Sequence, residues 1–233
     1  MEDRVNLKSK DMLESLEKNS KNIVRANIVM IIGVIVLFAT FLLAVGATFI
    51  TGGFMGSAEG AIFAMLGSLL IGLIISMIFL IYGSYILYTS TKDMKYTSEA
   101  DTSTMAKSLN TSITILYYSA LLGLIGSILL IIGVGIILIG LAALLWDIGL
   151  ILFAMELKKF GEDYEDPSNL LMVGAILSLL GVLLHQNLGS VLIIAGLVLI
   201  LVGFNKLSIV AEKDRMELMR QISVSEESSD FSM

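Results

Sequence analysis

The chain has 233 residues, of which 56% are hydrophobic and only 15% are charged. Soluble domains carry about 25% charged residues, so this composition indicates an integral membrane protein. The net charge of −6 argues against a nucleic-acid partner. The absence of cysteine and the presence of a single histidine, His185, predict that the chain has no disulfide and no metal site.

The first 25 residues are predicted to form a cytoplasmic amphipathic helix. Val5, Met12, Leu16 and Ile23 recur at near-heptad spacing, with polar residues between them. We expect this segment, residues 1–25, to lie on the inner membrane surface and to lead into the first membrane helix. The alternative is a short coiled-coil contact with another copy of the chain or with a partner.

Three long stretches with almost no charge follow this segment. Residues 26–91, 108–157 and 167–205 together hold only three charged residues. A membrane span needs about 20 apolar residues, so each stretch is long enough for two helices joined by a turn. The predicted fold is therefore all-α and integral to the membrane, with six transmembrane helices arranged as three hairpins. The expected helices are about 28–50, 62–88, 112–133, 137–158, 169–185 and 188–207, within a transmembrane domain of residues 26–207.

The basic residues predict the orientation of these helices. All 15 lysines and arginines fall before helix 1, between helices 2 and 3, between helices 4 and 5, or after helix 6. Because cytoplasmic segments are enriched in basic residues, both termini are expected to be cytoplasmic, in a cell membrane. A five-helix arrangement with residues 112–145 as one span would move six of the 15 basic residues outside, and we reject it.

The segments between and after the membrane helices are expected to be polar. Residues 92–108 and the acidic residues 161–167 are predicted loops, so Pro167 interrupts no helix. Residues 208–233 are predicted to continue as a helix to Met219, with Lys213 paired to Glu217, and then to form a disordered, acidic, serine-rich tail. None of these segments is large enough to be a soluble enzymatic domain.

Glycine recurs at seven-residue spacing in predicted helices 3, 5 and 6, and Gly140 begins a similar series of small residues in helix 4. Small residues at this spacing allow two helix backbones to approach closely, so we expect these positions to pack helices together within the chain. Contact between copies of the chain is the alternative. The glycines expected at helix contacts are Gly126, Gly133, Gly140, Gly174, Gly181, Gly189, Gly196 and Gly203.

The two C-terminal hairpins show an internal similarity. Residues 125–134 read IGSILLIIGV and residues 173–182 read VGAILSLLGV, as expected if one hairpin is a duplicate of the other. This glycine-punctuated pattern, over residues 120–208, resembles uncharacterised families of small archaeal multi-pass membrane proteins. The resemblance rests on no catalytic motif and implies no activity.

Asp147 is the one acidic residue near the middle of a predicted membrane helix. An ionised aspartate there costs about 2.5–3.5 kcal/mol on insertion scales. No lysine, arginine or histidine lies within a predicted span to pair with it, which favours a protonated carboxyl that donates to a carbonyl or hydroxyl of a neighbouring helix. It continues a seven-residue series of Gly140, Asp147 and Ala154, so it should face other helices. The alternative interpretation is a proton or cation relay.

Two functions remain, and neither is enzymatic. We find no serine–histidine pairing, no HExxH, no P-loop and no paired intramembrane carboxylates, so we expect no catalytic residue and no cofactor. The first function is a non-catalytic scaffold, assembly factor or accessory subunit that acts through helix packing. The alternative is a small transporter or channel component that uses Asp147. The expected partners are membrane lipids and either another copy of the chain or a different membrane subunit.

Overall fold

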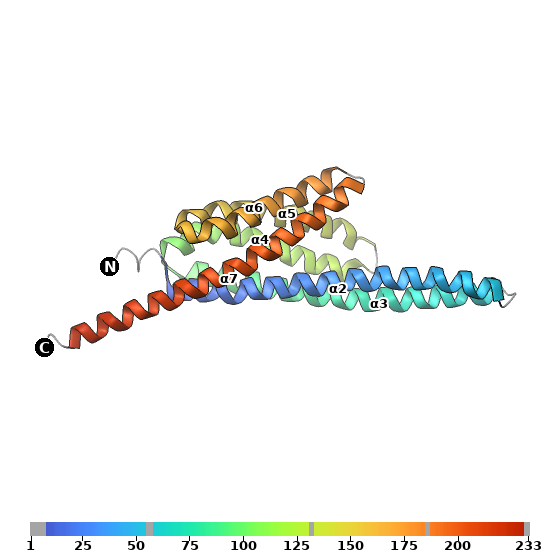
Figure 1. The fold of residues 1–233 in the computed structure, drawn as a ribbon, viewed down its shortest axis with the longest axis horizontal. Helices are drawn as coiled ribbons and strands as arrows, with labels where there is room; N and C mark the ends of the chain where they lie inside the picture. Colours follow the sequence, from blue (N-terminus) through green and yellow to red (C-terminus); the bar gives the residue numbers. More distant parts are fainter. Residues whose placement is uncertain (1–7, 55–57, 131–132, 185–186, 231–233) are drawn as a thin grey trace. The chain divides into compact units, whose positions relative to one another are not determined.

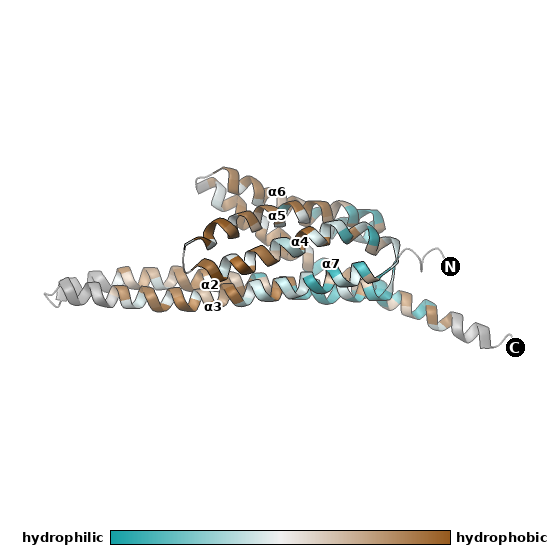
Figure 2. Ribbon diagram, turned by 180° about the vertical axis from the view of Figure 1, so that it is seen from behind, coloured by the Kyte–Doolittle hydropathy of each residue, from teal (hydrophilic) through white to brown (hydrophobic). Residues whose placement is uncertain are grey.

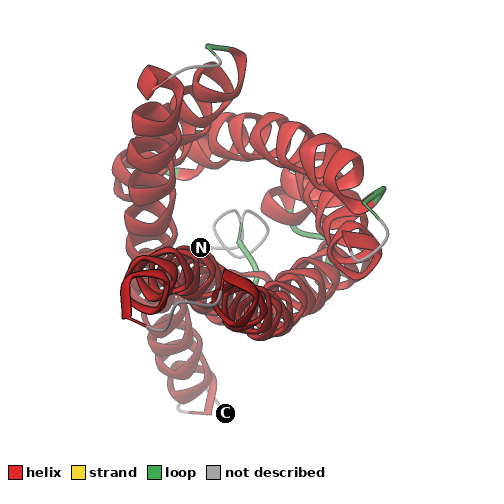
Figure 3. Cartoon of the chain, turned by 90° about the vertical axis from the view of Figure 1, so that its right-hand side faces the viewer, coloured by secondary structure: helices red, strands yellow, loops and turns green. Residues whose placement is uncertain are grey.

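The computed structural model describes residues 8–54, 58–130, 133–184 and 187–230, and it divides into two compact units. Unit 1 comprises the residues before Arg25 and those from Leu87 onward, and unit 2 comprises Arg25–Ile86. Across the described ranges every element is helical (Figure 3). The elements are α2 (Lys10–Phe54), α3 (Ala58–Ala100), α4 (Thr104–Leu129), α5 (Gly135–Leu157), η2 (Lys158–Phe160), η3 (Glu162–Tyr164), α6 (Glu165–Leu183) and α7 (Asn187–Asp230).

The all-α prediction is confirmed. Among the described residues, six helices are long and apolar enough to cross a membrane. They follow one another as the hairpins α2–α3, α4–α5 and α6–α7 (Figure 1). Val5 and His185, which the sequence analysis considered, lie outside the described residues.

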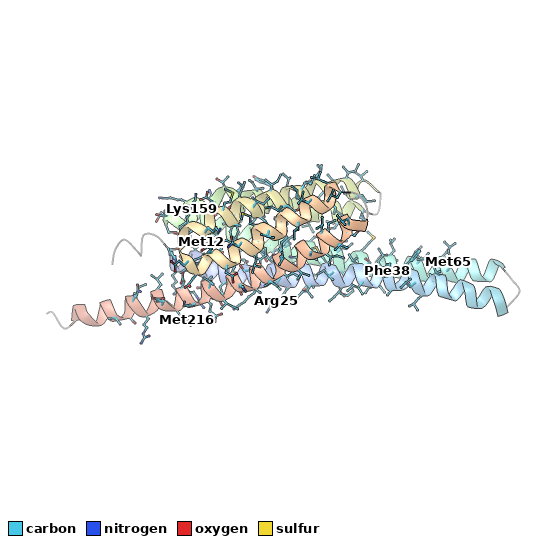
Figure 4. All side chains as sticks on the ribbon, turned by 45° about the horizontal axis from the view of Figure 1, so that its top comes forward. Met12, Arg25, Phe38, Met65, Lys159 and Met216 are labelled. Carbon is cyan, nitrogen blue, oxygen red and sulfur yellow. The ribbon has the colours of Figure 1, made fainter. Side chains whose placement is uncertain are left out.

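Unit 2 is a hairpin of the apolar parts of α2 and α3. The two helices approach closely at glycines, since a Cβ atom at Gly33 would lie 2.8 Å from the Cβ atom of Phe79. Gly83 faces Met30 in a similar way. The outward side chains are large and apolar: Phe38, labelled in Figure 4, is 64% exposed. Close backbone contact inside and apolar side chains outside are what a lipid-facing hairpin requires.

Unit 1 contains the remaining two hairpins and the polar segments that flank them. α4 packs against α5, α6 against α7, and α5 against α6 (Figure 1). Hydrophilic residues gather at one end of this unit and hydrophobic residues at the other (Figure 2). Its buried apolar cluster draws on α2, α3, α4, α5, α6, α7 and the short η elements. Representative members are Met12, Leu16, Met94, Leu109, Phe153, Tyr164, Phe204 and Leu207.

The loop that the sequence predicted for residues 92–108 is much shorter in the structure. α3 continues to Ala100 and α4 begins at Thr104, so only a short turn separates them. The polar residues of this region form contacts instead of a loop: the Ser98 hydroxyl lies 3.0 Å from the side-chain oxygen of Asn110 on α4. Ser103 caps α4 by accepting a hydrogen bond from the Ala106 amide. Polarity alone therefore did not distinguish a loop from a polar helical contact.

Pro167 does not lie in a loop, as the sequence analysis had expected, but in the first turn of α6. The first-turn amides of a helix have no intrahelical acceptor, so a proline there loses nothing and leaves the helix unbroken. The chain break before α6 falls instead at Gly161, between η2 and η3, where φ is 132°. This positive φ explains why glycine occupies the position.

Over the described residues the structure has a helix where a disordered tail was expected. α7 runs from Asn187 to Asp230 without interruption, well beyond Met219. Once a helix is nucleated by packing, each added residue gains a backbone hydrogen bond at small cost. The apolar face that includes Leu207, Ala211 and Leu218 remains buried, and this packing holds α7 in place.

Candidate functional site

Asp147 lies at the contact between α5 and α6. Its side chain is buried, with only 2% of the residue exposed. Its carboxyl forms a hydrogen bond with the hydroxyl of Ser178 on α6. Its second oxygen, Oδ2, is buried and has no hydrogen-bond partner among the described residues. Asp147 therefore links two hairpins of unit 1 through a single polar contact.

Close packing continues on both sides of this contact. A Cβ atom at Gly196 of α7 would lie 2.8 Å from the backbone nitrogen of Ser178. On the α4 side, a Cβ atom at Gly149 would lie 2.9 Å from the side chain of Leu116. Asp147 does not line the cavities beside Lys8, Lys158 or Arg220, which are formed by described residues. The surroundings of Asp147 thus resemble a packed helix interface.

Most of the predicted packing glycines lie where helices touch. A Cβ atom at Gly174 would lie 2.8 Å from the carbonyl oxygen of Gly196, and one at Gly181 would lie 2.6 Å from that of Gly189. Such distances are too short for any residue larger than glycine unless the backbone moves. The glycines with close neighbours on another helix are Gly126, Gly174, Gly181, Gly189, Gly196 and Gly203.

Within the described part of the chain, Gly133 and Gly140 do not pack against another helix. No atom of another described element lies within 4 Å of the position that a Cβ atom would take at either residue. Gly133 instead has a φ of 80° in the turn before α5, a conformation that glycine adopts without strain. Gly140 lies in the exposed first turns of α5, beside Ile137, which is 68% exposed. The predicted series through Gly140, Asp147 and Ala154 is therefore buried only from Asp147 onward.

A second candidate site, the charged end of unit 1, is formed by residues 8–24, 158–166 and 206–221. Ion pairs connect the start of α2 to α7: the Lys8 ammonium lies 2.6 Å from Asp214, and the Arg215 guanidinium lies 3.0 Å from Glu17. The Lys21 ammonium lies 2.8 Å from the Glu17 carboxylate, one turn earlier on the same helix. The side chains of Glu17 and Asp214 are only 14% and 13% exposed, so these pairs are partly shielded from water.

The connector between α5 and α6 is tied to α7 in the same way. Lys213 pairs with Asp163 at 2.9 Å, and not with Glu217 as the sequence spacing had suggested. Tyr164 is fully buried and its hydroxyl donates a 2.9 Å hydrogen bond to Asp214. The ammonium of Lys8 lies 4.7 Å from the centre of the Tyr164 ring. Asp214 is therefore the common acceptor for a lysine from the N-terminal segment and a tyrosine from the connector.

A cavity of about 330 Å³ opens beside this network. Its lining combines apolar and charged side chains from the N-terminal segment, the connector and α7. The lining residues are Lys8, Leu13, Phe160, Asp214, Glu217, Leu218 and Gln221. Across the described ranges, no group of three or more histidine, cysteine, aspartate or glutamate residues is placed to hold a metal ion.

The sequence analysis did not identify this charged end as a site. The signal was the mixture of charges at residues 212–217 with buried Ala211 and Leu218 on either side, which is typical of a helix that packs through one face. The acceptors of these charges lie far away in the sequence, and spacing along one helix does not identify such partners. Glu156 and Lys159, three residues apart, form an ion pair at this end with a separation of 2.7 Å.

Comparison with known proteins gives a family but no activity. The family model described as "Protein of unknown function (DUF973)" matches residues 9–230, which is nearly the whole chain. The match therefore covers both units, not only the C-terminal hairpins. Neither the curated proteins nor the solved structures contain a match. The chain belongs to the DUF973 family of proteins of unknown function.

Proposed function

We propose that the chain is a multi-pass protein of the cell membrane, with both termini cytoplasmic, that serves as a non-catalytic scaffold, assembly factor or accessory subunit. Six helices of sufficient length and apolar character support the membrane location. The confinement of all 15 basic residues to one side of the predicted hairpins supports the orientation. Its partners on this proposal are lipids and either a second copy or another membrane subunit.

The packing around Asp147 is the observation that favours a scaffold. A transport path needs polar groups in series along a hydrated route. Asp147 instead meets one hydroxyl, that of Ser178, and Ser178 is in turn covered by Gly196. A carboxyl in such a position holds two helices together when it is protonated and donates a hydrogen bond. The role of Asp147 on this proposal is therefore structural.

The alternative is a small transporter or channel component. Its support is the second oxygen of Asp147, which is buried without a partner among the described residues. An acceptor left free inside a membrane protein is costly and is a feature of ion-binding positions. This alternative requires that the carboxyl can lose and regain a proton while the protein is folded.

Flux across reconstituted membranes separates the two functions. The purified chain is placed in liposomes under an imposed pH gradient, and the movement of protons, sodium and potassium is recorded. For a scaffold we expect no flux above that of empty liposomes, and we expect Asp147→Asn to retain the thermal stability of the wild type, because asparagine preserves the shape and a hydrogen-bond donor.

The matched control is Glu156→Gln, which makes the same chemical change at a carboxyl already paired with Lys159. Wild-type flux that Asp147→Asn abolishes and Glu156→Gln retains would overturn the scaffold proposal. Absence of flux for all three ions, with the protein shown to be inserted, would remove the transporter alternative for those ions.

A further inference from the structure

Tyrosine and lysine side chains form a cluster where α3 meets α4 in unit 1. The rings of Tyr88 and Tyr117 have centroids 5.7 Å apart, and those of Tyr117 and Tyr118 are 5.1 Å apart. Tyr96 and Tyr118 are more than half exposed. We refer to the following residues as the tyrosine–lysine cluster: Tyr88, Lys92, Lys95, Tyr96, Tyr117 and Tyr118.

The two lysines lie over the tyrosine rings. The ammonium of Lys92 is 5.8 Å from the ring centres of both Tyr88 and Tyr96, which precede and follow it by one helical turn. The ammonium of Lys95 is 5.8 Å from the centre of Tyr96 and 5.3 Å from that of Tyr117. Cation–π contacts of this kind hold the ammonium groups in place at the surface.

One of these positive charges is not neutralised by a carboxylate. Lys95 pairs with Glu99 at 3.0 Å. Lys92 has no ion pair among the described residues, although Asp93 is next to it in the chain. The Asp93 carboxylate points elsewhere and accepts hydrogen bonds from Lys18 and Asn19, at 3.0 and 3.1 Å. Lys92 therefore carries a positive charge that is available to an anion.

The cluster lies at a boundary between apolar and polar sequence. Lys92 is the first charged residue after an uncharged stretch that begins at Gly60. Tyr117 and Tyr118 follow Lys107, the last charged residue before Asp147. In a membrane protein such a boundary lies near the lipid headgroups, where tyrosine is enriched and where long basic side chains extend toward the phosphates.

We propose that the tyrosine–lysine cluster binds the phosphate-containing headgroup of an anionic phospholipid. The ammonium of Lys92 and the exposed hydroxyls of Tyr96 and Tyr118 supply donors for phosphate oxygens. A choline headgroup fits less well, because the ring faces that would bind its cation are already occupied by lysines. This inference rests on the proposed membrane insertion, and it names anionic phospholipids as the lipid class that the chain binds.

Native mass spectrometry of the purified full chain tests this site. The protein is titrated in detergent with phosphatidylglycerol and, separately, with phosphatidylcholine of the same acyl chains. We expect the wild type to retain phosphatidylglycerol in preference to phosphatidylcholine. Lys92→Gln should weaken phosphatidylglycerol binding about fivefold and leave phosphatidylcholine binding unchanged, whereas Lys92→Arg should keep the preference.

Lys107→Gln is the matched control, because it removes the same charge from an exposed lysine of α4 that lies outside the cluster. Equal binding of the two lipids by the wild type would overturn the proposal. An equal loss in Lys92→Gln and Lys107→Gln would also overturn it, because a general positive field would then explain the preference. Displacement of the lipid by millimolar inorganic phosphate would also overturn it, because the site would then bind free phosphate and not a lipid headgroup.

Carbonate extraction of cell membranes keeps the two proposals apart. A chain that remains in carbonate-washed membranes but does not prefer phosphatidylglycerol overturns the lipid site and leaves the membrane proposal in place. A chain that carbonate releases overturns both. The Lys92→Gln protein should lose little thermal stability, since the Lys92 side chain carries no ion pair among the described residues and its two cation–π contacts lie at the surface.

Discussion

At the scale of single residues, glycine and a few polar groups determine how the helices meet. Gly174 and Gly196 face each other across α6 and α7 with no room for a side chain, whereas Gly140 has open space around it. In the sequence, all three glycines belong to a seven-residue series of small residues and look alike. The difference lies in which helix turns have a neighbour, and spacing along one helix does not contain that information.

Gly196→Ala is therefore expected to destabilise the fold and Gly140→Ala is not. The added Cβ atom at residue 196 would lie 2.8 Å from the backbone nitrogen of Ser178, so a backbone must shift, which typically costs about 1–3 kcal/mol. Thermal unfolding in detergent measures the effect. Equal melting temperatures for the two variants would contradict the packing described for α6 and α7.

Tyr164→Phe tests the buried hydrogen bond at the charged end. The variant keeps the ring but removes the hydroxyl that donates to Asp214 at 2.9 Å, and hydrogen bonds to charged groups are worth about 1.5–3 kcal/mol. We expect a lower free energy of unfolding. Tyr118→Phe, at a ring that is 55% exposed, provides the comparison and should change stability little.

At the scale of helices, the pattern of apolar residues predicted the number and pairing of the elements but not their lengths. The three stretches with almost no charge were long enough for two spans each, and each forms a helical hairpin in the structure. α3 and α7 continue past their apolar parts because their polar side chains contact other elements. Ser98 of α3 forms a hydrogen bond with Asn110, and Lys213 of α7 forms an ion pair with Asp163. These partners are distant in sequence, so the polar segments read as loops or a tail when taken alone.

Arg215→Ala should loosen α7 beyond the apolar part of the helix. The guanidinium of Arg215 lies 3.0 Å from Glu17 and 3.8 Å from Glu14, so its loss leaves the partly buried Glu17 with only Lys21 as an ion-pair partner among the described residues. We expect faster amide hydrogen exchange in residues 208–224 than in the wild type. In Arg220→Ala, where the side chain is exposed, exchange should be unchanged; the same increase in both variants would show that the contact with α2 does not hold α7.

At the scale of the whole molecule, the six-helix count follows from the sequence because hydrophobic length is a local property. The candidate sites could be predicted from the sequence only in part. Asp147 stood out as the lone acid near the middle of a predicted span, but its partner Ser178 did not, since serine is common in membrane helices. The ion pairs of Asp214 with Lys8 and of Glu17 with Arg215 join segments about 200 residues apart and required the fold itself.

The proposed orientation predicts opposite labelling at the two ends of α4. The chain has no cysteine, so single substitutions give an unambiguous readout. Thr102→Cys, in the exposed turn before α4, should react with an impermeant thiol reagent only after the cells are permeabilised. Val134→Cys, in the turn after α4 at a residue 52% exposed, should react in intact cells. The reverse pattern would invert the topology, and labelling of both from outside would exclude a single span between them.

The unbroken course of α7 has a mechanical consequence. From Lys206 to Asp230 the helix extends about 36 Å beyond its apolar part, at 1.5 Å per residue. A membrane helix that is longer or shorter than the local bilayer adjusts by tilting. With the apolar part of α7 in the bilayer, as proposed, a tilt of about 10° would move the far end of this uninterrupted helix by about 6 Å. Asp214 and Arg215 lie on this extended part of α7 and pair with Lys8 and Glu17 of the N-terminal segment. A change in bilayer thickness that tilts α7 would therefore strain these two ion pairs.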